Sequence, residues 1–264
     1  MTAAQIATLL AEIKLFAREM KLPTVAREAE ALAIQSRRAG DDPLVLLHAL
    51  LAAEHRDRDT RRAHRRVKEA HFPLTKTLEG FAFKRNPTLD EGRIRGLAHG
   101  GYIQAGEPVL LIGGTGTGKT HIGLALGHAA CALGTGVRFV TAAGLANELV
   151  EADQARHLSR IVARYARFEL LVIDELGYLP LTPIAAQLLF QVIAERGERR
   201  ATIITTNLPF SEWTTVIEDP RLCRAFIERI TFRAHIIETG DHSVRLEDML
   251  ALKANATKKE AVKT

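Results

Sequence analysis

One glycine-rich stretch, residues 113–120, constrains the fold of this chain more than any other feature. Its sequence, GGTGTGKT, matches the pattern G-x-x-x-x-G-K-[ST]. Residues 108–112 before it are typical of a short buried strand, and the apolar residues of 121–133 after it recur at helical spacing. A glycine-rich turn that contains Lys-Thr by chance would not have both flanks. The order of strand, loop and helix therefore predicts a phosphate-binding loop within an α/β fold.

The residue types of this loop suit the binding of nucleotide phosphates. Its glycines let the backbone curl with the N–H groups pointing inward, and the start of the next helix adds partial positive charge. Lys119 can neutralise the terminal phosphates, and the Thr120 hydroxyl can bind Mg²⁺. The predicted nucleotide-binding residues of the loop are Gly113, Gly114, Thr115, Gly116, Thr117, Gly118, Lys119 and Thr120.

Composition limits the other classes that the chain could belong to. The chain has 264 residues and a hydrophobic content of 47%, enough for a large core, yet no apolar run is long enough to cross a bilayer. No secretory signal is evident, and Cys131 and Cys223 are isolated, as in a reducing cytosol. We therefore expect a cytoplasmic protein with no membrane partner. The net charge of +5 is compatible with a polyanionic partner but does not require one.

The first part of the chain is predicted to be a small, entirely helical domain. Residues 1–71 are rich in Ala, Leu and Arg, and they lack the alternation that is typical of strands. Pro23 and Pro43 each suit the first turn of a helix. We expect helices over residues 2–20 and 23–40 and a third from Pro43 onwards.

The pattern changes after this domain. Irregularly spaced prolines and glycines mark residues 72–106 as a connector, within which 89–97 fit a helix. Over residues 107–252, short apolar runs alternate with helical patterns, which predicts a parallel sheet covered by helices on both faces. The expected strands are 109–112, 137–141, 170–173, 202–205 and 234–238. Residues 253–264 are a basic tail that we expect to be disordered.

A strongly basic segment lies toward the end of the predicted third helix. It contains Arg56, Arg58, Arg61, Arg62, Arg65, Arg66 and Lys68, with Asp57 and Asp59 as its acidic residues. Such a run is usually a solvated helix face, but this density of one charge also fits binding to a nucleic-acid backbone. Because no aromatic residues are interleaved, any such contact should be electrostatic and independent of base sequence. Both interpretations are open.

Two adjacent carboxylates, Asp174 and Glu175, end the predicted strand at 170–173. At the carboxyl edge of a parallel sheet they would emerge beside the glycine-rich loop. Asp174 is then placed to hold Mg²⁺, largely through water, and Glu175 to orient or deprotonate an attacking water. Alone, the pair could simply cap a helix. Together with the loop, it predicts a site that cleaves a phosphate bond.

A third polar strand end strengthens this prediction. The strand at 202–205 is followed by Thr206 and Asn207, whose side-chain amide can contact a γ-phosphate or the nucleophilic water. A Thr-Thr-Asn ending is by itself more often a turn. Its position one strand after the acidic pair favours a functional role.

These motifs resemble those of AAA+ ATPases. The segments that carry the resemblance, besides the loop, read LLVIDELGYLP, ITTNLPFSEW and FIERI. Within that superfamily, the chain from about residue 72 to 245 is most similar to IstB-type ATPases, which assist transposition of bacterial insertion sequences and are related to DnaC-type helicase loaders. The resemblance implies an AAA+ α/β fold after a helical N-terminal domain, with ATP and Mg²⁺ as cofactors and hydrolysis to ADP and phosphate.

The resemblance also implies roles for single residues. Asn207 falls at the position of the sensor of the γ-phosphate, and Arg245 at that of a second sensor. Arg229 falls where such ATPases carry an arginine finger, which completes the site of a neighbouring subunit; Arg221 and Arg224 are rivals for this role, and each could equally make a surface salt bridge. The implied catalytic residues are Lys119, Glu175, Asn207 and Arg229. Little sequence follows Arg245 to form a helical lid.

The partners implied by the resemblance are duplex DNA bound without sequence preference, a cognate transposase and further copies of the chain. A second basic stripe fits DNA binding, because Arg156, Arg160, Arg164 and Arg167 recur at helical spacing. The alternative is a helicase loader of the DnaC type, whose N-terminal helices would hold a helicase. A small-molecule kinase would need neither the basic helices nor Glu175, Asn207 and Arg229 together.

Overall fold

The computed structural model describes residues 2–244 and divides between Arg65 and Arg66 into two compact units. Arg245 and the tail at 253–264 therefore lie outside the described residues. Among the residues from 2 to 244, no helix combines the length and the apolar content that a membrane span needs.

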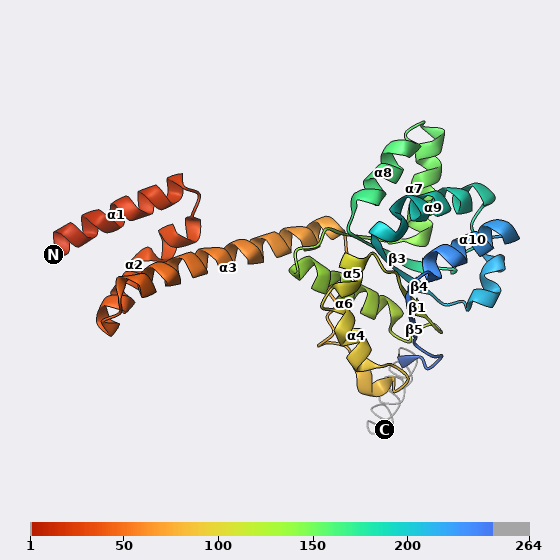
Figure 1. The fold of residues 1–264 in the computed structure, drawn as a ribbon, viewed down its shortest axis with the longest axis horizontal. Coiled ribbons are helices and arrows are strands. Elements are labelled where there is room, and N and C mark those ends of the chain that lie inside the picture. The colour runs from red at the N-terminus through yellow and green to blue at the C-terminus, as the bar shows by residue number, and fades with distance from the viewer. Residues whose placement is uncertain (1, 245–264) are drawn as a thin grey trace, which may run out of the picture. The chain divides into compact units, whose positions relative to one another are not determined.

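The first unit consists of helices, as predicted. Helix α1 spans Ala3–Glu19, α2 spans Pro23–Ala39, and α3 spans Pro43–Ala70 and continues into the second unit (Figure 1). The side chain of Thr2 caps α1 in a capping box with Gln5. Gly40, with a φ of 70°, adopts the left-handed conformation that ends α2. The breakers seen in the sequence thus set the ends of these helices.

A five-stranded parallel sheet forms the centre of the second unit. Its strands are β1 (Val109–Ile112), β2 (Val137–Thr141), β3 (Leu170–Leu176), β4 (Ala201–Thr206) and β5 (His235–Glu238), in the order β2-β3-β4-β1-β5. All neighbouring pairs are parallel. The predicted strands are confirmed, with β3 longer at its carboxyl end. The predicted α/β class is confirmed with them.

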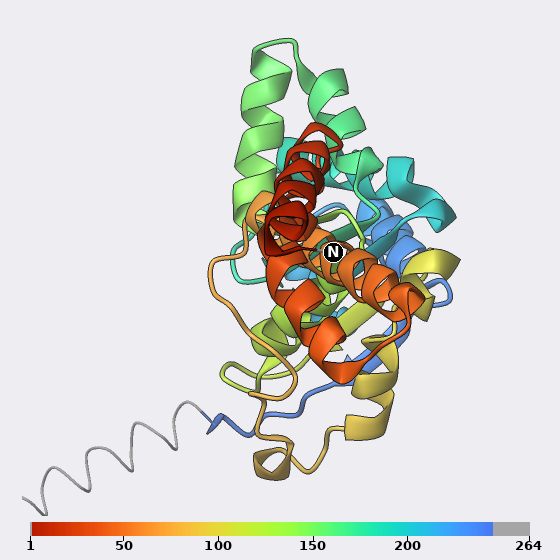
Figure 2. The same ribbon diagram turned by 90° about the vertical axis from the view of Figure 1, so that its left-hand side faces the viewer.

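Helices cover both faces of this sheet and enclose two apolar cores. The first core holds α7 (Ala142–Gln154), α8 (Leu158–Arg167), α9 (Pro183–Arg196) and α10 (Pro220–Thr231), with the short turn of helix at Phe210–Thr215. The second holds α4 (Glu91–Leu97), α5 (Gly101–Ala105) and α6 (Lys119–Ala132). Successive β1 residues Leu110 and Leu111 point into opposite cores, as the two-residue period of a strand requires. Figures 1 and 2 show α7 and α8, in green, running side by side.

Residues 72–106, expected to be a connector, are part of the second core. Leu78, Phe83, Leu89, Ile94 and Leu97 are all buried there. This stretch contains a single turn of helix at Phe83–Arg85; another such turn lies outside it, at Gly197–Arg199 after α9. The apolar residues of this stretch are spaced irregularly between prolines and glycines, so their burial left no periodic pattern in the sequence. The helix expected over 89–97 is present as α4, and the Asp90 side chain caps it.

Candidate functional site

The sheet order brings the three predicted polar segments together. Strands β3, β4 and β1 are neighbours, and because they are parallel their carboxyl ends share one edge. The loop follows β1, the acidic pair ends β3, and Asn207 follows β4. Residues from all three segments line one cavity of about 90 Å³: Thr115, Gly116, Lys119, Thr120, Glu175, Tyr178, Thr205, Thr206 and Asn207.

The glycine-rich loop has the compact shape that its sequence predicts. Gly113 and Gly118 have φ angles of 151° and 100°. A Cβ on Gly118 would lie 2.5 Å from a ring carbon of Phe81, so a larger residue would have to displace this ring as well as adopt a φ that favours glycine. Helix α6 begins at Lys119, and the Lys119 Nζ donates hydrogen bonds to the carbonyl oxygens of Gly113 (2.7 Å) and Gly114 (2.6 Å). The amine is therefore held against the loop.

Asp174 joins the loop helix to the two central strands. Its side chain is 5% exposed, and its Oδ1 accepts hydrogen bonds from the hydroxyls of Thr120 (3.0 Å) and Thr205 (2.5 Å). Hydroxyl and carboxylate oxygens are ligands that Mg²⁺ accepts in proteins. The chemistry of this donor set fits the magnesium site expected at Thr120 and Asp174. Thr205 was missed as a member of the site, because the sequence places it merely at the end of a buried strand.

Glu175 is turned toward the cavity by an irregularity in the sheet. The pairing of β3 with β4 shifts between Ile173 and Leu176, so β3 contains an extra residue at this point. Glu175 has a φ of 61°, unusual for a residue with a side chain, and its N–H donates to the Thr205 Oγ1 at 2.9 Å. Its carboxylate is exposed beside the buried Asp174. The two acids thus have different environments.

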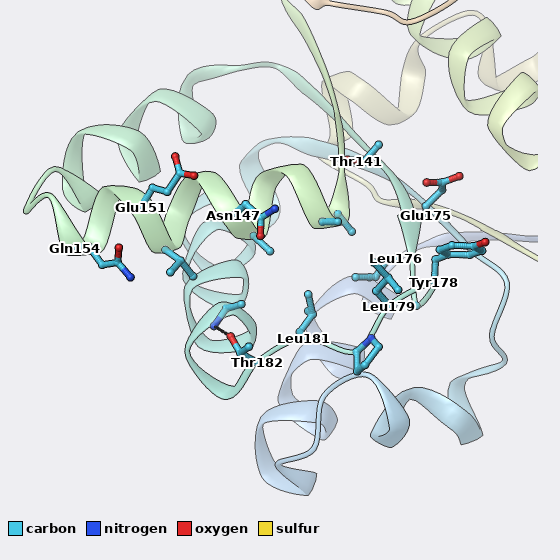
Figure 3. Close-up of a pocket in the computed structure, with 17 residues that line it drawn as sticks. Thr141, Asn147, Glu151, Gln154, Glu175, Leu176, Tyr178, Leu179, Leu181 and Thr182 are labelled. Atoms are coloured by element: carbon cyan, nitrogen blue, oxygen red, sulfur yellow. Dashed lines mark hydrogen bonds between the residues drawn. The ribbon is translucent and has the colours of Figure 1, made fainter.

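A larger cavity adjoins the edge of the sheet at which Glu175 lies. It measures about 460 Å³ and lies between α7 and residues 176–182 (Figure 3). Glu175 and Tyr178 line both this cavity and the smaller one that contains Lys119. Tyr178 is 66% exposed and was not predicted to be part of this edge.

A further cavity beside the loop has the size to receive the nucleoside part of a nucleotide. It measures about 490 Å³, within the usual range for small-molecule sites, and it is lined by the loop residues 116–120 together with Phe81, Ala82, His121 and Val244. Phe81 and Ala82 come from the stretch expected to be a connector. Sequence reasoning therefore found the phosphate half of the site and missed this half.

Arg229 lies away from the loop of its own chain. It is in the last turn of α10, and its Nη2 donates to the carbonyl oxygen of Ala194 near the end of α9 at 2.9 Å. It lines a separate cavity with Glu107, which precedes β1, at the edge where the strands begin. Arg221 and Arg224 are exposed in the first half of α10.

The basic segment of α3 is less one-signed than its sequence suggests. Arg58 and Arg61 contact the buried carboxylate of Glu54 at 3.3 and 3.5 Å, and Arg61 also contacts Asp57 at 2.9 Å. Glu54 in turn accepts the backbone N–H of Thr24 at 2.8 Å, at the start of α2. Part of the positive charge is thus neutralised within the unit. The other members are Arg62, which contacts Asp59, exposed Arg56, Arg65 and Lys68, and half-buried Arg66.

The second basic stripe does not form one helical face, and that prediction was wrong. Arg156 has a φ of 58° and lies in the turn between α7 and α8. The sequence spacing hid this break, because no proline or glycine marks it. Arg160 is exposed on α8, whereas Arg164 pairs with Glu148 and lies 5.0 Å from the ring centre of Tyr165. Burial opposes ionisation of Glu148, but hydrogen bonds from Tyr165 and Arg164 outweigh it and lower the pKa of Glu148.

Comparison with known proteins identifies a family whose model matches this chain. A family model described as IstB-like ATP binding protein matches residues 16–251. The chain is 34% identical over 233 residues to a protein of Geobacillus stearothermophilus named for insertion sequence IS5376 and for ATP binding, a match that covers 88% of this chain and 93% of that protein. It is 30% identical over 237 residues to a protein of Pseudomonas aeruginosa named for insertion sequence IS21 and for ATP binding, covering 90% and 89% of the two chains.

Solved structures share the fold of the second unit. The DnaA protein of Aquifex aeolicus bound to AMPPCP has a TM-score of 0.53 and 21% identity, over 64% of this chain and 51% of that one. A structure of DnaI has a TM-score of 0.52 and 19% identity, over 62% of this chain and 90% of that one. At these identities the likeness establishes the fold alone, which is that of AAA+ proteins.

Proposed function

Because the chain belongs to the family of IstB-like ATP-binding proteins, we propose that it hydrolyses ATP and uses this cycle to assist the transposition of an insertion sequence. The observation that carries hydrolysis is the meeting of loop, acidic pair and Asn207 around one cavity. ATP binding alone would need only the loop. An exposed carboxylate beside the phosphate position is what water attack requires in addition.

The geometry supports a different role for each of these residues. Lys119 binds the β- and γ-phosphates, and Thr120 with Asp174 would hold Mg²⁺, which when bound neutralises phosphate charge. Glu175 accepts a proton from the attacking water, and Asn207 fixes the position of that water or of the γ-phosphate. The hydrogen bond from Thr205 to Asp174, 2.5 Å long, keeps the carboxylate in place.

We propose further that the site is completed by a second copy of the chain. Arg229 is exposed at the edge of the sheet where the strands begin, so it is not available to the loop of its own chain. A neighbouring subunit could bring its Arg229 to the phosphates, where the guanidinium would stabilise transition-state charge. Release of the hydrogen bond to Ala194 would be part of this movement.

Duplex DNA and a transposase are the proposed partners. Support comes from the relatives, which are named for insertion sequences, and from exposed basic residues such as Arg56, Lys68 and Arg160. In this proposal, ATP between subunits favours an oligomer that holds DNA through its phosphates, and a transposase responds to that state. The likeness to DnaI concerns the fold alone, so it does not favour a helicase loader over this role.

Glu175→Gln is expected to separate binding from hydrolysis. The amide keeps the size of the side chain but cannot accept the proton, so turnover should fall about a hundredfold while ATP affinity stays within about twofold. Turnover is measured by phosphate release, and retention of a labelled DNA duplex in the presence of ATP is measured by fluorescence anisotropy. Glu151→Gln, at an exposed acid of α7 that lines the larger cavity, is the matched control. Wild-type turnover of Glu175→Gln would remove this residue from catalysis.

Mixing two inactive variants tests the shared site. Arg229→Ala alone should lower turnover about a hundredfold, and Lys119→Ala should have no measurable turnover because it does not bind ATP. In a mixture, an Arg229→Ala subunit keeps its loop and can receive Arg229 from a Lys119→Ala neighbour, so part of the activity should return. A mixture of Lys119→Ala with Glu175→Gln is the control and should stay inactive, because both defects lie in the same half of the site. If the first mixture is also inactive, Arg229 does not act between subunits.

A further inference from the structure

A buried polar network lies beneath the phosphate-binding loop. Asn86, at the end of the helical turn Phe83–Arg85, is 1% exposed. Its Nδ2 donates to the carbonyl oxygens of Thr239 (2.9 Å) and Thr117 (3.3 Å), and its Oδ1 accepts the hydroxyl of Thr88 (2.6 Å). The amide therefore connects three segments that are far apart in the sequence: the stretch before the sheet, the loop and the end of β5.

Two threonines extend this network across the loop. The hydroxyls of Thr117 and Thr239 are 2.5 Å apart, and both residues are about 99% buried or more. The Thr117 hydroxyl also donates to the carbonyl oxygen of Gly114 at 2.9 Å, and the Thr239 Oγ1 is 3.3 Å from the carbonyl oxygen of Ile112. The loop is thus fastened by side chains at Ile112, Gly114 and Thr117.

The backbone reinforces the same contacts. Gly114 donates its N–H to the carbonyl oxygen of Gly240 at 2.8 Å, and Thr239 donates its N–H to that of Ile112 at 2.7 Å. A Cβ on Gly113 would lie 2.5 Å from the Thr239 Oγ1, so the loop passes as close to this residue as a glycine allows. The segment after β5 and the loop therefore form one packed element.

The hydrogen bond to the Thr117 carbonyl fixes the direction of the next N–H group in the loop. In a trans peptide, the C=O of one residue and the N–H of the next point in opposite directions. Holding the Thr117 carbonyl on Asn86 therefore turns the N–H of Gly118 away from Asn86. Such N–H groups are what a loop of this kind offers to phosphate oxygens.

We propose that Asn86 and Thr239 are positioning residues, which hold the loop in the shape that accepts phosphate although neither touches the nucleotide. A loop rich in glycine has little stiffness of its own, and ordering it during binding would weaken the affinity. The network orders the loop beforehand. This inference rests on the proposed function, because it concerns the site at which ATP is bound.

The test compares ATP affinity with loop order in matched variants. Asn86→Leu and Thr239→Val keep the size of each side chain but remove its hydrogen-bonding groups, and each should raise the Kd for ATP about tenfold. Thr239→Ser keeps the hydroxyl and should stay within about twofold of wild type. Thr202→Val removes a buried hydroxyl at the far end of β4, next to Arg196, and should also stay within about twofold. Affinity is measured by isothermal titration calorimetry.

Hydrogen exchange of the peptide over residues 113–118 provides a readout without nucleotide. Exchange should be faster in Asn86→Leu and Thr239→Val than in Thr239→Ser and Thr202→Val. If Asn86→Leu does not fold, the pair of Thr239 variants decides by itself. Wild-type affinity and exchange in Thr239→Val, or an equal loss of affinity in Thr202→Val, would overturn the inference. If the variants show the expected differences in hydrogen exchange but the wild-type protein does not bind ATP, the proposed function is overturned and the inference about the loop is not.

Discussion

Replacing Lys119 by alanine is expected to abolish ATP binding at ordinary nucleotide concentrations, with a rise in Kd of about a hundredfold to ten-thousandfold. The ammonium is the cationic side chain that the loop itself supplies at the phosphates, and a charge-assisted hydrogen bond to each of two phosphates contributes about 1.5–3 kcal/mol. In the structure, this amine already donates hydrogen bonds to the carbonyl oxygens of Gly113 and Gly114 in the loop. It therefore has little conformational freedom to lose when phosphate binds.

Calorimetric titration with ATP measures this effect. Lys68→Ala, at an exposed lysine of α3, is the matched control and should bind ATP like the wild type, because that side chain is not part of the site. Thermal unfolding without nucleotide should establish that Lys119→Ala is folded. An affinity within about tenfold of the wild type would contradict the central claim that the loop binds phosphate through Lys119.

Replacing Arg196 by methionine is expected to lower the free energy of unfolding by about 3–5 kcal/mol, because it leaves three buried carbonyl groups unpaired. Arg196 is 1% exposed at the end of α9, and its guanidinium donates to the carbonyl oxygens of Tyr165 (2.6 Å), Phe168 (2.9 Å) and Ala201 (2.5 Å). Burial lowers the pKa of Arg196 to about 9, so the side chain is still charged at neutral pH. Methionine would leave these carbonyls buried and unpaired, and each such loss costs about 1–3 kcal/mol.

Urea unfolding followed by circular dichroism measures this loss. Arg199→Met changes an exposed arginine three positions later, in the turn that follows α9, and should alter the free energy of unfolding by less than about 0.5 kcal/mol. A loss below about 1 kcal/mol for Arg196→Met would mean that water reaches the carbonyls and that the guanidinium is not needed to satisfy them. The contacts join the ends of α8 and α9 to the start of β4, so the site edge is affected only through overall stability.

The part of the site that could be predicted from the sequence consists of residues at the carboxyl ends of strands. An apolar run precedes each of the predicted segments, which are residues 113–120, Asp174 with Glu175, and Asn207. A parallel sheet brings the carboxyl ends of neighbouring strands together, independently of how the connecting helices pack. That rule needs no knowledge of side-chain packing. It is the reason why segments separated by dozens of residues could be assigned to one cavity.

The rest depends on contacts that no local pattern encodes. Thr205 meets Asp174 because Ile173 and Ile204, the residues before them, pair between β3 and β4, and a threonine on a buried strand carries no mark of this. Asn86 and Thr239 meet across 153 positions of sequence. Arg156 was assigned to a helix because charges at four-residue spacing are typical of one, but a turn without glycine or proline has no signature that periodicity can detect.

At Glu175, the left-handed backbone lowers the stability of the fold, whereas the proposed reaction needs a carboxylate at this position. A residue with a Cβ pays roughly 1 kcal/mol or more to adopt this conformation, and glycine would adopt it without strain. Selection for a sturdier fold alone would therefore push this position toward glycine, which has no carboxylate. With the proposed role of Glu175 as the base, a chain that keeps glutamate here has a less stable fold but retains the carboxylate that turnover needs. Glu175→Gly is therefore expected to stabilise the fold and to abolish turnover.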